Sequence, residues 1–179
     1  MVLDFLPAQS QNLMHTENII TIQGSLDHIF LLAAEIENWP RILPHYREVT
    51  VFERSADGTR KVVEMAAVRD NFPLHGLRFP VRWRSVQICE PEIGRITFKH
   101  IGGIARGMWV VWEIAPDRWG RGVRVSISHE LRYPFSMMNG VFAKNIVGDV
   151  FVSAIAGRTL LTIKQLAEAE ARLNGVQSD

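Results

Sequence analysis

The spacing of apolar residues changes once along this chain. Between Glu48 and Tyr133 they recur at every second position, whereas after Pro134 they recur at steps of three and four. The first spacing is typical of half-buried β-strands, and the second is typical of one long amphipathic helix. Short turns separate the strand-like segments, so neighbouring strands should pair as an antiparallel meander. Because a curved antiparallel sheet must bury one face, we expect the long helix to cover it.

The pattern predicts one strand, two helices, six further strands and the long helix. Ser25 is expected to cap the first helix, which extends through Ile36, and Trp39-Pro40 should stop or kink it before a short helix over Arg41–Tyr46. The predicted strands are Glu17–Gly24, Glu48–Arg54, Thr59–Arg69, Leu77–Cys89, Arg95–Ile101, Gly107–Ala115 and Gly122–Arg132. The long helix should end near Asn174-Gly175, with an inward stripe of Phe142, Ile146, Val150, Ser153, Gly157, Leu160 and Leu161.

The composition fits a single domain. The 179 residues are 47% hydrophobic, and 20 Lys and Arg balance 19 Asp and Glu, so no excess of basic charge suggests nucleic-acid binding. No apolar run approaches the roughly 20 residues of a membrane span. The first residues contain Asp4 but no Lys or Arg, unlike a signal peptide, and either Met1 or Met14 can be the natural start. We expect a cytoplasmic monomer or homodimer without stable membrane insertion, with a flexible extension over residues 1–14 and one domain over residues 15–175.

Alternation along four strands assigns side chains to the two faces of the sheet. The inner face should carry Phe79, Val81, Trp83, Ser85, Gln87, Ile96, Phe98, His100, Met108, Val110, Trp112, Ile114, Val123, Val125, Ile127, His129 and Leu131. The outer face should carry Arg82, Arg84, Lys99, Trp109, Val111, Glu113, Arg124, Ser126, Ser128 and Glu130. The strand Thr59–Arg69 does not divide in this way, and the direction of Arg69 stays open.

The predicted inner face is apolar and aromatic, with four polar side chains: Ser85, Gln87, His100 and His129. One inward histidine by itself is more often a satisfied core residue. The four together favour a small-molecule pocket, because burying each without a partner costs about 1–3 kcal/mol. The six histidines lack zinc-protease spacing, and the single cysteine has no thiolate companion, so we expect no metal.

The order of elements and the segment Glu35–Tyr46, with its Trp39-Pro40 and Leu43-Pro44 pairs, resemble the helix-grip superfamily of START-related proteins. More narrowly, residues 15 to 170 are similar to the polyketide cyclase/dehydrase and lipid-transport family. This resemblance implies an α+β helix-grip fold, in which a curved antiparallel sheet of about seven strands wraps around the C-terminal helix and encloses a deep cavity.

The resemblance also implies cavity residues. Aromatase/cyclases of this family line the cavity with side chains that match Trp39, Tyr46, Trp83, His100, Met108 and Trp112. Their cavity arginine has no counterpart here, because Gln87 stands at that position, four residues after Trp83. The expected ligand-binding residues are Trp39, Trp83, Ser85, Phe98, Met108, Val110, Trp112 and Ile127.

Three functions are compatible with these sequence features. The first is a polyketide cyclase/dehydrase without a cofactor, which catalyses aldol ring closure and dehydration of a poly-β-ketone chain. In it, His100 or His129 takes the α-proton while Tyr46 and Gln87 hold carbonyl oxygens. The second is a non-catalytic carrier of a lipid, quinone or similar apolar ligand, which the uncharged Gln87 favours. The third is an interaction module with a fully packed core.

Overall fold

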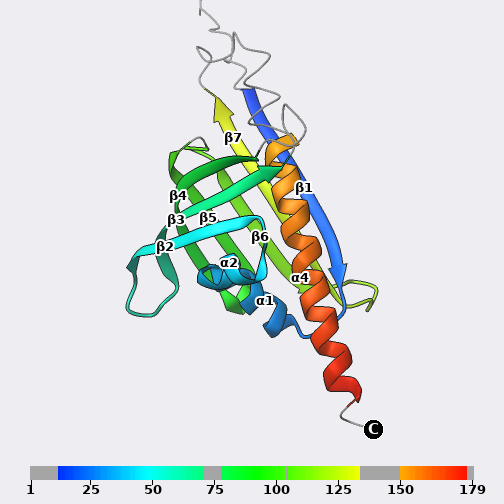
Figure 1. Ribbon diagram of the computed structural model, residues 1–179. Helices are drawn as coiled ribbons and strands as arrows, with labels where there is room; N and C mark the ends of the chain where they lie inside the picture. The colour runs from blue at the N-terminus through cyan, green and yellow to red at the C-terminus, as the bar shows by residue number, and fades with distance from the viewer. Residues whose placement is uncertain (1–11, 71–77, 104, 134–149, 177–179) are drawn as a thin grey trace, which may run out of the picture.

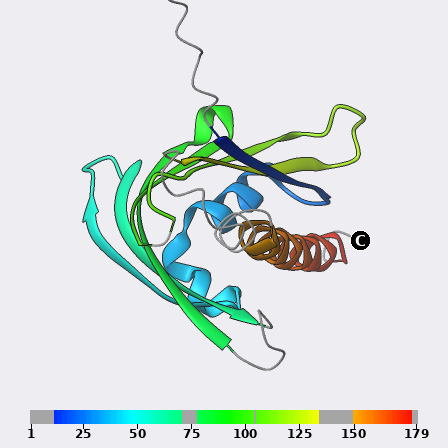
Figure 2. The same ribbon diagram turned by 90° about the horizontal axis from the view of Figure 1, so that it is seen from above.

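The computed structural model describes residues 12–70, 78–103, 105–133 and 150–176. Within these residues, a curved seven-stranded sheet wraps around the C-terminal helix (Figures 1 and 2), which confirms the predicted α+β helix-grip architecture. The elements follow in the order β1 (Asn12–Ile22), α1 (Leu26–Ala34), η1 (Ile36–Asn38), α2 (Trp39–Ile42), β2 (Tyr46–Arg54), β3 (Arg60–Asp70), β4 (Arg78–Glu90), η2 (Pro91–Ile93), β5 (Arg95–Gly103), β6 (Trp109–Pro116), β7 (Val123–Tyr133) and α4 (Val150–Val176).

The strands form one antiparallel sheet in the order β1-β7-β6-β5-β4-β3-β2. Strands β2 to β7 are the predicted meander, since each pairs with the next in the chain, and β1 pairs along β7. The main difference in boundaries is that β1 starts at Asn12 instead of Glu17. The strand therefore includes residues 12–14 of the predicted extension, and residues 1–11 lie outside the described part of the chain.

Helix α4 lies along the concave side of the sheet (Figure 2). Its buried apolar side chains recur at steps of three and four and are Ala156, Leu160, Ile163 and Ala167. Burial of each Leu or Ile contributes about 1.5–3 kcal/mol, so this stripe ties the helix to the sheet. Leu161, which we expected in the stripe, is 51% exposed because its neighbour Leu160 takes the inward direction. The predicted stripe residues Phe142 and Ile146 lie outside the described residues.

The helical segment between β1 and β2 differs from the prediction in its boundaries. Ser25 caps α1 as expected, but the helix ends already at Ala34. Trp39-Pro40 does not stop a helix and instead begins α2, where a proline has no intrahelical N–H bond to lose. The predicted helix over Arg41–Tyr46 is wrong, because α2 ends at Ile42 and the chain enters β2 four residues later.

The predicted faces of β4 to β7 are confirmed, with one exception. The described inner side chains are buried or half-buried, and the outer face exposes Arg82, Arg84, Lys99, Trp109, Glu113 and Glu130. Ser126 lies on the outer face but is buried, because Ile19 of β1 and Glu113 of β6 flank it and Arg124 donates to its hydroxyl at 3.4 Å.

Strand β3 did not divide into two faces in the sequence because both of its faces are buried. Val63 and Met65 lie on the inner face, and Val62 and Ala66 on the outer face, and all four are buried. The side chain of Arg69 is outside the described residues, so its direction stays a prediction.

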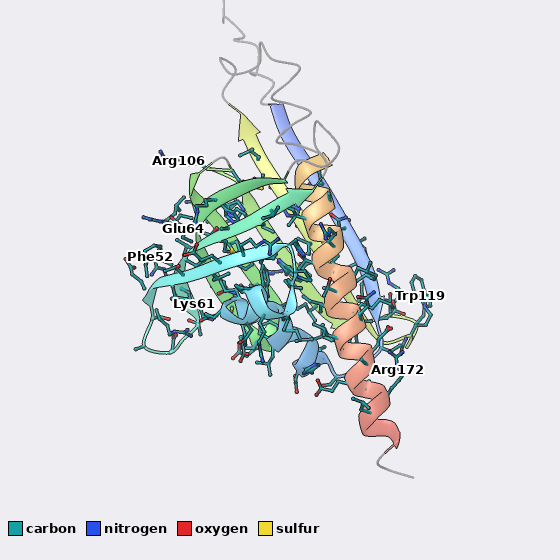
Figure 3. The ribbon with its side chains drawn as sticks, viewed as in Figure 1. Phe52, Lys61, Glu64, Arg106, Trp119 and Arg172 are labelled. Atoms are coloured by element: carbon teal, nitrogen blue, oxygen red, sulfur yellow. The ribbon has the colours of Figure 1, made fainter. Side chains whose placement is uncertain are left out.

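Two turns show why the strands end where they do. Gly94, after η2, has a φ of +61°, and a Cβ there would collide with the backbone oxygen of Ile114, so the β4–β5 turn requires glycine. At the β6–β7 hairpin, Trp119 projects into solvent with 68% of its surface exposed (Figure 3), as expected for a hairpin tip. Among the described residues, the helices are too short or too polar for any of them to cross a membrane.

Candidate ligand-binding site

A cavity lies between the inner face of the sheet, the segment that carries α2, and α4. Its volume is about 70 Å³, so the core is not fully packed, although most ligand pockets measure roughly 300–1,000 Å³. A ligand of several rings therefore requires side chains to move. The described residues that line the cavity are Trp39, Tyr46, Met65, Trp83, Phe98, His100, Ala105, Met108, Val110, Trp112, Ile127, His129, Ile155, Ala156 and Thr159.

The structure brings the predicted site residues together at this cavity, except for Gln87 and Ser85, which lie behind its wall. Sequence reasoning missed five lining residues: Met65, Ala105, Ile155, Ala156 and Thr159. Met65 lies on the strand whose faces could not be separated, and the inward side of α4 depends on how the helix sits on the sheet. Periodicity alone does not contain that information.

Trp39 is the centre of an aromatic wall. Its ring centroid lies 4.7 Å from Tyr46, 6.0 Å from Trp112 and 6.3 Å from Phe98, which are distances of direct ring contact. Its indole Nε1 donates to the backbone oxygen of Leu32 at 3.0 Å. The polar edge of the ring is thereby satisfied, and the ring is fixed against α1.

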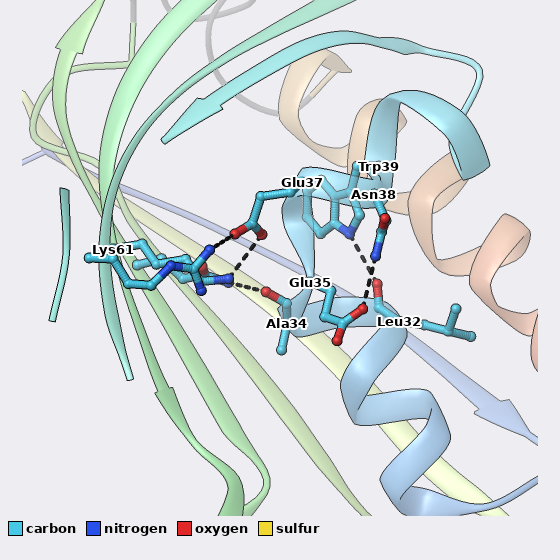
Figure 4. Close-up of polar contacts among 9 residues, drawn as sticks. Leu32, Ala34, Glu35, Glu37, Asn38, Trp39 and Lys61 are labelled. Atoms are coloured by element: carbon cyan, nitrogen blue, oxygen red, sulfur yellow. Dashed lines mark hydrogen bonds and ion pairs between the residues drawn. The ribbon is translucent and has the colours of Figure 1, made fainter. Parts of the chain in front are cut away.

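A polar cluster anchors the segment that carries Trp39 to the sheet (Figure 4). Lys61 of β3 donates to Glu37 at 2.9 Å, Arg54 also pairs with Glu37, and Gln87 donates through Nε2 to the backbone oxygen of Ala34 at 2.9 Å. Burial acts to raise the pKa of Glu37, but the bonds from Lys61, its own backbone and Arg54 outweigh this effect and lower it.

This cluster changes the role expected for Gln87. Its side chain belongs to the anchor of the helical segment and does not line the cavity. Lys61 is also buried, with 6% of its surface exposed. Its ammonium group pairs with the carboxylate of Glu37, and Lys61 does not line the cavity. Sequence reasoning missed Lys61 as a buried residue because a lysine is rarely buried unless it is paired.

The two cavity histidines are buried and uncharged at neutral pH. Burial lowers the pKa of His100 to about 4. Burial, followed by repulsion from His100 and His15, lowers the pKa of His129 to about 3. The Nδ1 atom of His100 lies 2.6 Å from the hydroxyl of Ser85, and the Nδ1 atom of His129 lies 3.4 Å from that of Thr16.

Tyr46 and Thr159 add two hydroxyl groups to the cavity wall. The Thr159 hydroxyl donates to the backbone oxygen of Ile155 at 2.9 Å, so it must accept the hydrogen bond that joins it to Nε2 of His45 at 2.8 Å. Burial raises the pKa of Tyr46, and its contact with Thr159 offsets part of the rise. Sequence reasoning did not place His45 near the site, because its partner Thr159 lies far along the chain, in α4, whereas His45 directly precedes β2.

The sequence profile described as polyketide cyclase/dehydrase and lipid transport matches residues 22–154, which is more than half of the chain. The chain belongs to the polyketide cyclase/dehydrase and lipid transport family. Both the helix-grip geometry and this match confirm the predicted family.

Three known proteins illustrate what this family member is similar to. A Streptomyces halstedii protein that carries the name of a polyketide cyclase is 39% identical over 46 residues, or 26% of this chain and 42% of the relative. The di-domain aromatase/cyclase StfQ of the steffimycin biosynthetic pathway is 21% identical with a TM-score of 0.69, over 89% of this chain and 52% of that one. The Zhui aromatase/cyclase of Streptomyces sp. R1128 is 15% identical with a TM-score of 0.65, over 90% and 94%.

The matches to the first two proteins span only about half of their lengths. At 21% and 15% identity, the two solved structures establish a shared fold.

This polyketide cyclase family member has an uncharged cavity. Among the described lining residues there is no Asp, Glu, Lys or Arg. The indole Nε1–H of Trp83 is buried and has no hydrogen-bond partner among the described residues. In the described part of the chain, no three His, Cys, Asp or Glu side chains gather in a way that could hold a metal ion.

Proposed function

We propose that the cavity binds a hydrophobic or aromatic small molecule and that the protein acts as an aromatase/cyclase-like enzyme on a poly-β-ketone chain. The observation that carries this proposal is the pair of uncharged histidines, His100 and His129, on an otherwise aromatic and apolar wall. Membership of the polyketide cyclase/dehydrase family and the names of the similar proteins support the same chemistry.

In the proposed reaction, an imidazole nitrogen takes a proton from a carbon that lies between two carbonyl groups. That carbon then forms a bond to the carbon of another carbonyl group farther along the chain. The oxygen of this carbonyl group takes the proton back from the imidazolium and becomes a hydroxyl group. Loss of a further α-proton and of this hydroxyl releases water and leaves a carbon–carbon double bond. No electrons are exchanged with a cofactor, and the imidazole returns to its neutral state.

Orientation has to supply most of the rate enhancement. A histidine whose pKa is about 4 or about 3 is a weak base, because efficient proton transfer needs a pKa near the working pH. Holding a chain in the bent geometry of ring closure contributes up to about 7–11 kcal/mol. The contacts of Trp39 with Tyr46, Trp112 and Phe98 give the wall the rigidity that such orientation requires.

The ligand is expected to enlarge the cavity when it binds. Met65 and Met108 line the wall, and their unbranched side chains can change rotamer at low cost. The N–H of Trp83, which has no partner in the described part of the chain, costs about 1–3 kcal/mol in the free protein, and a ligand oxygen would remove that cost. Both features favour a ligand that is flat, apolar and oxygenated.

The test is ring closure of an aromatic polyketide precursor by the wild-type protein and by His100→Ala/His129→Ala. We expect the double variant to lose at least a hundredfold in rate, since each proton-transfer or hydrogen-bonding group typically contributes that much. The matched control is His28→Ala, which removes a histidine outside the cavity and should leave the rate unchanged. A loss of less than about tenfold in the cavity variant would remove both histidines from the chemistry.

A non-catalytic carrier is the second candidate, and one observation favours it. With no charged side chain among the described lining residues, the wall offers nothing ionic to stabilise an enolate. A native mass spectrum of the freshly purified protein, compared with a denatured one, discriminates the two functions. A defined lipid or quinone mass would favour the carrier, whereas an empty protein that closes rings would support the cyclase.

A further inference from the structure

Ser85 and His100 form a hydrogen-bonded pair at the cavity wall, in which His100 lines the cavity and Ser85 lies behind it. They face each other on neighbouring strands β4 and β5, and the Ser85 hydroxyl lies 2.6 Å from Nδ1 of His100. Ser85 is fully buried, with 0% of its surface exposed. Because solvent does not reach this hydroxyl, its proton needs an acceptor within the protein.

A neutral imidazole carries its proton on either Nδ1 or Nε2, and the two arrangements differ in what happens to Ser85. If the proton were on Nδ1, that nitrogen would donate to Ser85, and the serine proton would have no acceptor among the described residues. If the proton is on Nε2, Ser85 donates to Nδ1, and the remaining ring N–H faces the cavity, where solvent or a ligand can accept from it. The second arrangement is therefore favoured.

The other ring nitrogen faces a different environment. His100 lines the cavity, and its Nε2 has no hydrogen-bond partner among the described residues. We propose that Ser85 holds neutral His100 in the Nε2–H tautomer, so that His100 presents a hydrogen-bond donor to the cavity and Ser85 acts as its positioning residue. The group that this donor recognises is an acceptor oxygen, such as a ligand carbonyl.

This assignment deepens the proposed function and, for its consequence in catalysis, rests on it. A ring nitrogen that already carries a proton cannot take one from the substrate, so His100 would hold a carbonyl oxygen as its negative charge develops. Proton acceptance would then fall to His129. Its Nδ1 contact with Thr16 is longer, at 3.4 Å, and Thr16 is only half-buried, so no contact among the described residues fixes a tautomer of His129.

The test is a long-range ¹H–¹⁵N spectrum of histidine side chains in the ligand-free wild-type protein at pH 7. The spectrum distinguishes the two neutral tautomers and the charged imidazolium, and His100→Gln identifies the signals of His100 by their loss. We expect a protonated Nε2 and an unprotonated, hydrogen-bonded Nδ1. A protonated Nδ1, or a charged ring, would overturn the proposal.

Ser85→Ala provides a second readout that a purely structural role would not move. Without the hydroxyl, the Nδ1 signal of His100 should shift to the position of an unprotonated nitrogen that accepts no hydrogen bond. The matched control is Ser128→Ala, on the outer face of β7, which should leave the His100 signals unchanged. An unchanged Nδ1 signal in folded Ser85→Ala would overturn the assignment, and the wild-type spectrum decides if that variant does not fold.

Neither measurement requires a ligand or turnover. The tautomer can therefore be found as proposed in a protein that proves to be a carrier, and it can be refuted in one that proves to close rings. The tautomer of His100 and the cyclase function can therefore be refuted independently of each other.

Discussion

Replacing Glu37 by glutamine should destabilise the protein more than removing its buried partner, the ammonium group of Lys61. The two charged atoms lie 2.9 Å apart, and only 7% of the Lys61 side chain is exposed, against 32% for Glu37. At an effective dielectric constant of about 20, Coulomb's law gives about 6 kcal/mol for this separation. The exposure of Glu37 and the desolvation of Lys61 offset much of that energy.

We expect Glu37→Gln to lower the free energy of unfolding by about 2–3 kcal/mol, because it leaves the ammonium of Lys61 buried without a carboxylate. Lys61→Met removes the charge and keeps the aliphatic stem, while Glu37 retains Arg54 and contact with water. That variant should stay within about 1 kcal/mol of the wild type.

Urea unfolding of both variants at pH 7, followed by circular dichroism, measures the two free energies. The order of the two effects is the decisive quantity. A larger loss in Lys61→Met would mean that the lysine stabilises the fold by a contact other than its ion pair with Glu37, and the predicted order would be wrong.

Three further predictions concern the cavity and its anchor. Because burial lowers the pKa of His100 to about 4 and of His129 to about 3, below about 6.5 in the unfolded chain, stability is fully present above pH 6.5 and should fall as pH drops towards 4. Urea titrations should show a shallower fall in His100→Gln/His129→Gln, and an equal slope would contradict this. Gln87→Met should lower the free energy of unfolding by about 1–3 kcal/mol in urea, because it removes the donor to the backbone oxygen of Ala34. An unchanged free energy of unfolding would count against this role of Gln87. Trp112→Ala should weaken binding of 2-acetylnaphthalene at least tenfold in a fluorescence titration, and an unchanged dissociation constant would exclude the cavity as its site.

Much of the fold follows from local patterns. Alternation separated the faces of β4 to β7 correctly because one face of each strand is apolar and the other carries charges such as Arg84 and Glu113. On β3, alternation could not tell the inner face from the outer face, because Lys61 and Val62 lie on opposite faces and both are buried. A paired buried lysine looks in sequence like an exposed one, and only the position of Glu37 reveals the difference.

The candidate site was predictable as far as strand periodicity reached. His100, His129 and Trp112 were placed on the inner face by alternation alone, and they line the cavity. Gln87 shares that face but lies beneath the α1–α2 segment, and its hydrogen bond to Ala34 depends on where that segment crosses the sheet. Distances between elements far apart in the chain are set by tertiary packing, which a period of two does not encode.

The five tryptophans can report directly whether a ligand binds in the cavity. Trp39, Trp83 and Trp112 line the cavity, whereas Trp109 and Trp119 are 44% and 68% exposed on the surface. We would record the ¹H–¹⁵N indole signals while adding 2-acetylnaphthalene, an aromatic ketone. We expect the three cavity signals to shift, most of all that of Trp83, whose N–H has no partner among the described residues, and the two surface signals to stay unmoved. Shifts confined to Trp109 and Trp119, or none at saturating ketone, would contradict binding in the cavity.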